Sequence, residues 1–562
     1  MTTIQRSRVE LADLCEDYWR TCLRYSPIEG LTQGQVDART CFFREGLGDL
    51  QQRSLTREAM SRALEHIDTG PLDEQDLISF QMLQRQLSLE IRMEGLDDDL
   101  RPNLFPFGPE TSLHLAVTSF VAADAESAAD YLVRLASLPR SFADFLARYQ
   151  AGADKGYRLP AVLRSRVLSN IGASFADDPE HSYLLRPLSA GRFAKERDAA
   201  IALLKAEVYP ALRAYRDGLE RLLAASSRDS IGLRDEVDGD RYYAALIDRH
   251  TSLQMSPQEI HRLGLDELER IRSELVDVAR QAGHGGDVER LRAFARTNPE
   301  FTLDSAVELR ERIEVLSKRI DALIPAFFSR VPRTTFGVQS IPLNLSANMP
   351  PAYAQPAPAD RSAAGIHWIT SLPEKCPTYM HVPLALHEAW PGHLMHVALL
   401  EELEDLPRFR RFGALQHTAY IEGWALYCEG LGVDMGLYDD PYAHFGRLSM
   451  DAWRAARLVV DTGIHALGWD RERAVTFLEK HQAMGRAAAE SEVDRYIGMP
   501  GQALSYKLGH STLRTLRAHA QAQLGPAFSI REFHDALIKD GALPLPLLDE
   551  QVRRWIRSRA ES

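Results

Sequence analysis

Three side chains in the C-terminal half of the sequence have the types and spacing of a metal site. His387 and His393 belong to the segment HEAWPGH, and Glu422 follows inside an apolar run. A catalytic zinc ion takes three protein ligands, usually histidine or carboxylate, and leaves a fourth position for water. The sequence therefore predicts one Zn²⁺ site with these three ligands, and another divalent metal would also suit the same ligand set.

The spacing of the two histidines requires a break in the helix between them. On an unbroken helix, residues six apart point about 120° away from each other and lie about 9 Å apart along the axis. Pro391 lacks the amide that would bond the carbonyl of His387, and Gly392 can adopt backbone angles closed to other residues. We expect one helix to end or bulge near Trp390 and a second to start at Pro391, which brings His393 back to the same ion.

Two more carboxylates near these ligands have predicted roles. Glu388 is the candidate general base for a zinc-activated water. Glu422 and Glu429 lie seven residues apart in an apolar segment, hence on one helix face, and a buried carboxylate is costly without a cation. For Glu429 two interpretations stay open: an ion pair with an arginine, or a hydrogen bond that holds a ligand histidine.

The segment 453–465 carries polar residues that share one face of an apolar helix. Arg457, Asp461 and His465 recur at intervals of four. Arg457 is a candidate for binding a substrate carboxylate, and His465 is a candidate catalytic group that polarises the scissile carbonyl. A structural ion-pair ladder between helices explains the same pattern equally well.

A further helix start is predicted at residues 499–507. Gln502 and Tyr506 lie one turn apart on the same face of this helix. Tyr506 is the candidate donor to the oxyanion of a tetrahedral intermediate, and a core aromatic residue is the alternative interpretation. Gln502 and Lys507 are candidates for substrate binding.

Helical periodicity dominates the chain and predicts a mainly α fold, with many helices forming a shell around a central cleft. Ser256, Pro257 and Glu259 form a helix-start signal with a capping box. After residue 330, prolines and glycines become frequent, and β-favouring pieces at 336–343 and 365–371 predict a small hairpin or sheet just before the metal motif. Apolar residues recur every three or four positions in residues 9–25, 55–67, 75–93, 127–150, 192–225, 256–281 and 307–323.

Length, charge and cysteine content fit a soluble enzyme. We divide the 562 residues into an N-terminal helical region, 1–330, and a metal-site region, 331–562, which form two domains or one continuous domain. The net charge of -13 and the scattered basic residues argue against nucleic acid as a partner. We expect no membrane segment and no export signal. Five cysteines without paired spacing favour a reducing cytoplasm, and the oligomeric state stays undetermined.

Four motifs carry a resemblance to a known family. HEAWPGH, EGWALYCEGLG, WRAARLVVDTGIHALG and PGQALSYKLG occur in this order, and over nearly its whole length the chain resembles the bacterial domain-of-unknown-function 885 family. The resemblance implies a mostly helical, zinc-dependent peptidase. In that family a second histidine directly follows the one that matches His393, and a glutamine comes two residues later. This chain has Leu394 and His396 there.

The expected activity is metal-dependent hydrolysis of a peptide or related amide bond, with a peptide or small amide as substrate. Zinc-activated water would attack, Glu388 would act as base, and Tyr506 or His465 would steady the oxyanion. Two alternatives stay open. A lyase or non-haem iron oxygenase would use the same ligands on a small molecule. A non-catalytic binding protein with a structural metal would need a fourth protein ligand, such as His396 or Glu429.

Overall fold

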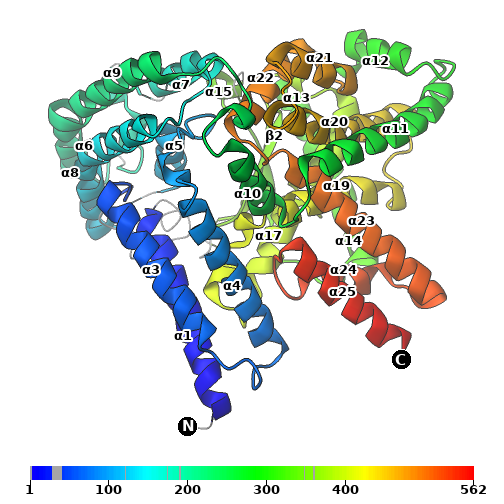
Figure 1. Cartoon of the computed structure of the whole chain (residues 1–562). Coiled ribbons are helices and arrows are strands. Elements are labelled where there is room, and N and C mark those ends of the chain that lie inside the picture. The colour runs from blue at the N-terminus through cyan, green and yellow to red at the C-terminus, as the bar shows by residue number, and fades with distance from the viewer. Residues whose placement is uncertain are drawn as a thin grey trace. The chain divides into compact units, whose positions relative to one another are not determined.

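The computed structural model describes residues 3–27, 41–120, 122–173, 175–176, 178–188, 191–346, 349–358, 361 and 363–561. As predicted, the fold is mainly helical and contains one small sheet (Figure 1). The chain divides into two compact units, residues 1–245 with 497–499, and residues 246–496 with 500–562. The boundary expected at residue 330 lies inside the second unit, and the observed division falls within helix α10.

The first unit consists of helices and their connections. α6 begins with a capping box between Asp124 and Ser127 and buries an aromatic face against α9. The helical stretch predicted at 192–225 is interrupted by a π-helical turn, Leu204–Val208. The helices are α1 (Thr3–Tyr25), α3 (Leu47–Glu65), α4 (Glu74–Glu94), α5 (Pro109–Ser119), α6 (Ala125–Asp154), α7 (Ala161–Ala173), α8 (Ala194–Leu203), α9 (Tyr209–Ser226) and α10 (Gly239–Thr251), which continues into the second unit.

The second unit contains the predicted metal motif. Its first long helix starts at the predicted capping box, where the Ser256 amide donates to Glu259 Oε2 over 2.8 Å. The helices are α11 (Pro257–Gln281), α12 (Val288–Thr297), α13 (Ala306–Asp321), α14 (Ile324–Phe327), α15 (Leu343–Ser346), α16 (His381–Glu388), α17 (His393–Glu401), α18 (Arg408–Phe412), α19 (Thr418–Asp434), α20 (Pro441–His465), α21 (Arg471–His481), α22 (Arg486–Gly498), α23 (Leu504–Leu524), α24 (Ile530–Ile538) and α25 (Leu545–Ala560).

A three-stranded sheet precedes the metal motif, as predicted. β1 (Phe336–Ser340) pairs parallel with β3 (Gly365–Ile369), and β2 (Ala352–Gln355) pairs antiparallel with β3. The order is β1-β3-β2. β2 lies against both α16 and α17, and β3 lies against α17. The sheet therefore supports the two helices that carry the histidines.

Two close helix pairs form the centre of the second unit. α11 packs along α20, and α19 packs along α23 (Figure 1). α19 and α23 approach so closely that a Cβ on Gly423 would lie 2.5 Å from the Cα of Gly509. Only glycine allows this contact. The contact fixes the position of α19, and with it the side chain of the neighbouring Glu422.

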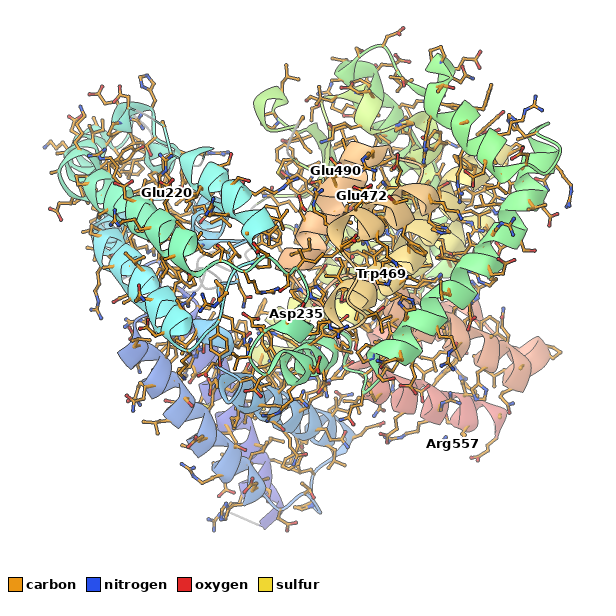
Figure 2. All side chains as sticks on the ribbon, turned by 45° about the horizontal axis from the view of Figure 1, so that its top comes forward. Glu220, Asp235, Trp469, Glu472, Glu490 and Arg557 are labelled. Carbon is orange, nitrogen blue, oxygen red and sulfur yellow. The ribbon has the colours of Figure 1, made fainter. Side chains whose placement is uncertain are left out.

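The surface of each unit carries charged side chains of both signs. Glu220 on α9, Glu472 on α21 and Arg557 on α25 are exposed (Figure 2). Among the described residues, no helix is both long and apolar enough to cross a membrane.

Candidate metal centre

The helix break predicted between the two histidines is present. α16 ends at Glu388 and α17 begins at His393, two residues later than the start expected at Pro391. Gly392 is the residue that permits the sharp return of the chain, since a Cβ there would lie 1.9 Å from the carbonyl oxygen of His387. The break therefore brings the two imidazoles to one place, as the spacing requires.

α19 supplies the third predicted ligand and also anchors the break. Glu422 lies on α19, and Trp424 on the same helix donates from its indole nitrogen to the carbonyl of Pro391 over 2.9 Å. The Trp424 side chain is buried. One helix thus positions both Glu422 and the turn between α16 and α17.

The three predicted ligands converge. Oε2 of Glu422 lies 3.6 Å from Nε2 of His387 and 3.4 Å from Nε2 of His393. The two imidazole rings have centroids 4.8 Å apart and are nearly perpendicular, at 87°. The three ligand atoms all lie within 4.8 Å of one another, and the described part of the chain holds no other such group of histidine, cysteine or carboxylate side chains.

This arrangement has the geometry that a small divalent cation needs. Oε2 of Glu422 is buried and has no hydrogen-bond partner, and a buried carboxylate oxygen without a hydrogen bond is costly. In a tetrahedral zinc site with bonds of about 2.0–2.1 Å, neighbouring ligand atoms lie about 3.4 Å apart. The two separations from Glu422, 3.4 and 3.6 Å, are close to that value, and two histidines with one carboxylate are a donor set that suits zinc.

Interactions between the side chains keep Glu422 ionised and favour a protonated His387. Burial opposes ionisation of Glu422, but contact with His387 and His393 holds the pKa of its carboxyl well below the usual range. Burial also opposes a charge on His387, but the nearby carboxylates of Glu422 and Glu429 outweigh it and raise the pKa of His387 to about 9. A metal ion that binds here must therefore displace a proton from His387.

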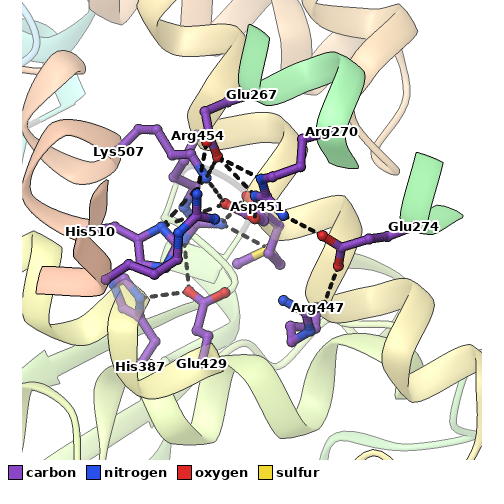
Figure 3. Close-up of polar contacts among 12 residues, drawn as sticks. Glu267, Arg270, Glu274, His387, Glu429, Arg447, Asp451, Arg454, Lys507 and His510 are labelled. Atoms are coloured by element: carbon purple, nitrogen blue, oxygen red, sulfur yellow. Dashed lines mark hydrogen bonds and ion pairs between the residues drawn. The ribbon is translucent and has the colours of Figure 1, made fainter. Parts of the chain in front are cut away.

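Glu429 contacts both kinds of partner that the sequence left open for it, a histidine and an arginine. Its Oε1 lies 2.8 Å from Nδ1 of His387 and 3.6 Å from Nη2 of Arg454 on α20 (Figure 3). With Nδ1 donating to Glu429, the Nε2 lone pair of His387 is available to a metal. His396, the other candidate for a fourth ligand, instead stacks on the ring of Trp424 with centroids 4.7 Å apart.

Glu388 lies next to the ligands as the last residue of α16 and is half-buried. Burial raises the pKa of its carboxyl, while the positive charges of His387 and His393 oppose the rise. A carboxylate with a raised pKa beside a candidate metal site has the chemistry that a general base requires.

Tyr506, Arg457 and Gln502 lie in one cluster. Burial and the charge of the nearby Glu422 raise the pKa of the Tyr506 phenol. The Arg457 guanidinium lies 4.3 Å from the centroid of the Tyr506 ring. Gln502 accepts a hydrogen bond from Arg495 over 2.7 Å. In this cluster, Tyr506 is the residue whose phenol lies near enough to Glu422 to experience its charge.

Two predicted site residues have other roles in the structure. His465 is buried, and its Nε2 donates to the carbonyl of Tyr496 over 3.0 Å. It also lies about 16 Å along α20 from Arg454, which contacts the ligand shell. The catalytic role expected for His465 is therefore corrected to a structural one. Asp461, on the same face, accepts from the amide of Gly501 over 3.1 Å and fixes the turn before α23.

Lys507 was expected to bind substrate, and this expectation is also corrected. Its side chain is 0% exposed, and its ammonium group pairs with Asp451 and, over 2.9 Å, with Glu267. A lysine enclosed in this way is a structural cation.

Sequence reasoning missed two residues of α22 that contact Arg457, namely Glu492 and Tyr496, and also Arg495, which shares Glu492 with it. It also missed the role of Arg454, although this residue lies within a quoted motif. The spacing of Glu492 and Arg495 predicts an ion pair along one helix, but nothing in it indicates contact with α20.

Two solved structures share this fold over nearly their whole length. A crystal structure described as that of the "putative lipoprotein" from Colwellia psychrerythraea is 25% identical, covers 99% of this chain and 100% of that chain, and has a TM-score of 0.91. A structure described as a "putative lipoprotein of unknown function" from Shewanella oneidensis is 15% identical, covers 98% and 99%, and has a TM-score of 0.75. No curated protein matches the chain.

The family resemblance inferred from the four motifs is confirmed at the level of the family. The model of the family described as "Bacterial protein of unknown function (DUF885)" matches residues 43–552, which is most of the chain. The chain therefore belongs to the DUF885 family.

Proposed function

We propose that this protein is a metal-dependent hydrolase that cleaves a peptide or related amide bond, with one zinc ion held by His387, His393 and Glu422. The observation that carries the proposal is the unpartnered Glu422 Oε2, which two imidazole nitrogens face at 3.4 and 3.6 Å. Such a set of two histidines and one carboxylate is a ligand set of catalytic zinc.

The side chains around the ligands supply the remaining chemistry. When bound, zinc acts as a Lewis acid and lowers the pKa of water to about 7. Glu388 accepts the proton of the attacking water and returns it to the leaving amine. Tyr506 donates a hydrogen bond to the developing oxyanion. Glu429 keeps His387 in the tautomer that presents Nε2.

Two observations favour a hydrolase over a protein with a structural metal. Neither Glu429 nor His396 belongs to the converging group, so three protein ligands leave a position for water. β2 lies at an edge of the sheet and against α16 and α17, and such an edge strand suits binding of an extended peptide by backbone hydrogen bonds.

The test is a hydrolysis screen over peptides and acyl amides, with and without a chelator. We expect turnover that the chelator abolishes and that added zinc restores. Glu388→Gln should keep the metal and lower turnover about 10²- to 10⁴-fold, because it removes the proton acceptor. Glu374→Gln, which changes an exposed carboxylate outside the site, is the matched control. Chelator-resistant turnover, or a Glu388→Gln variant with wild-type turnover, would refute the proposal.

A further inference from the structure

Beside Tyr506 lies a cluster of side chains that contains two arginines but only one carboxylate, and so carries one excess positive charge. Arg457 on α20 and Arg495 on α22 both contact one carboxylate, Glu492. Oε2 of Glu492 lies 3.0 Å from Nη2 of Arg457 and 2.9 Å from Nη2 of Arg495, and it accepts from the hydroxyl of Tyr496 over 2.7 Å. We call Arg457, Glu492, Arg495 and Tyr496 the arginine cluster. Among the described residues, neither arginine pairs with a second carboxylate.

One donor of the arginine cluster lacks an acceptor. Nη1 of Arg457 is buried and has no hydrogen-bond partner, and the Arg457 side chain is only 5% exposed. A guanidinium is always charged in proteins, and leaving a buried charged donor unpaired is costly. Glu492 already accepts from three side chains, so the excess charge of the arginine cluster calls for another anion.

The arginine cluster lies next to the predicted metal ligands and has a solvent-facing side. The Tyr506 ring lies 4.3 Å from the Arg457 guanidinium carbon, and Tyr506 lies one turn before Gly509, which packs against Gly423 beside Glu422. The side chains of Arg495 and Glu492 are 19% and 21% exposed. The exposed part of the arginine cluster therefore lies at Arg495 and Glu492, and the buried Arg457 connects it to Tyr506.

We infer that the arginine cluster binds a carboxylate of the substrate, so that the enzyme cleaves amides that have a free carboxylate beside the scissile bond. The C-terminal residue of a peptide and an N-acyl amino acid both have this form. In them the carboxylate carbon lies about 2.5 Å from the amide nitrogen, so its binding group must lie close to the metal ligands. This inference rests on the proposed function and adds that cleavage removes a terminal residue.

Binding to the metal-free protein tests the carboxylate site apart from catalysis. We would titrate chelator-treated protein with N-acetyl-alanine, N-acetyl-leucine and N-acetyl-phenylalanine, and with the corresponding amides, by calorimetry. Hydrogen bonds to a charged group predict that the acids bind about 10- to 150-fold more tightly than the amides. Equal affinity for acid and amide would overturn the inference.

Hydrolysis by the zinc-loaded protein separates the two proposals. N-acyl dipeptides with a free C-terminus should be cleaved with kcat/KM at least about tenfold above that of their C-terminal amides. If acids bind more tightly but no amide bond is cleaved, the proposed hydrolysis fails and the carboxylate site stands. If acids and amides are cleaved equally well, hydrolysis stands and the carboxylate site fails.

Two substitutions in the arginine cluster, one that removes a positive charge and one that removes a negative charge, give an independent test. Arg457→Gln should bring the ratio of acid affinity to amide affinity close to one, because the amides do not use the guanidinium. Thermal unfolding checks that the variant is folded. Glu492→Gln frees both arginines and should keep or tighten acid binding. A folded Glu492→Gln variant that loses acid binding would show a purely structural cluster and overturn the inference. Arg486→Gln, which changes an exposed arginine of α22, is the control and should keep the wild-type ratio.

Discussion

The second unit contains two buried polar groups that differ in how their charges are satisfied. One is the proposed metal centre of His387, His393 and Glu422. The other is a charge network around Lys507, in which the ammonium group contacts Asp451 (Figure 3). Both are built from ionisable side chains in an apolar interior, and both involve residues of the motifs that carry the family resemblance.

Every charge in the network has an opposite charge within reach. The Lys507 ammonium lies 2.9 Å from Glu267, and Arg270 contacts Glu267 over 2.8 Å and Asp451 over 3.0 Å (Figure 3). Burial opposes ionisation of both acids, but the charge of Lys507 holds the pKa of Asp451 far below its usual range and lowers that of Glu267 to about 2. The network joins α11, α20 and α23.

The metal centre differs because its atoms face one another without a hydrogen bond. The Glu422 oxygen is buried between two imidazole nitrogens and has no hydrogen-bond partner. The comparison shows that a concentration of buried charge does not by itself identify a functional site. What points to one is a convergent set of possible metal-ligand atoms that the protein leaves without hydrogen bonds to one another.

Breaking the network should have the largest effect on stability. Lys507→Met leaves Asp451 and Glu267 buried with one cation fewer, and loss of one partner of a buried pair typically costs about 3–5 kcal/mol. Urea unfolding of the metal-free protein measures this cost. Lys318→Met is the control, because this side chain is 81% exposed and pairs with Asp321 at the surface, where a pair contributes about 1 kcal/mol or less. Equal stability of the two variants would contradict a structural role for Lys507.

Removing one hydroxyl beside the metal centre should affect the rate and leave the fold intact. Tyr506→Phe should lower kcat about 10²- to 10³-fold, or about 3–4 kcal/mol, because it removes the donor to the oxyanion. Tyr420→Phe is the matched control, since the Tyr420 hydroxyl donates to the carbonyl of Leu537 over 2.7 Å. The control should lose about 1 kcal/mol of stability and keep its turnover. Full turnover by Tyr506→Phe would show that the phenol only packs.

Weakening the hydrogen bond between Glu429 and the predicted ligand His387 should have the smallest effect, a modest loss of metal affinity. Glu429→Gln keeps a hydrogen-bond acceptor for His387 but removes the negative charge, and changes of this kind typically lower metal affinity about 10- to 100-fold. Competition with a fluorescent chelator measures the affinity. Asp434→Asn, at the end of the same helix and paired with Arg517, should leave it unchanged. An unaltered affinity in Glu429→Gln would remove Glu429 from the metal centre.

Local chemistry explains which parts of this structure were predictable from sequence. The helix break at Pro391 and Gly392 depends on backbone properties of two adjacent residues, and the capping box at Ser256 depends on a four-residue pattern. The small sheet follows from β-favouring residues between turn residues. In these cases the cause and its effect lie within a few residues of each other.

Long-range pairing explains what was not predictable. The partners of Lys507 include Glu267 on α11, and those of Arg457 include Glu492 on α22. Helix periodicity places a residue on a face but does not say which distant helix that face meets. His465 therefore looked like part of the site, although it bonds to the carbonyl of Tyr496. The peptide substrate and the cytoplasmic location stay predictions.

Metal content is the most direct measurement. After reloading with zinc, elemental mass spectrometry should find one zinc ion per chain of the wild-type protein. Folded His393→Ala should contain none, because it lacks one of three ligands. His396→Phe keeps a ring against Trp424 and should retain the ion. One zinc ion per chain in folded His393→Ala, or none in the wild-type protein, would contradict the metal centre.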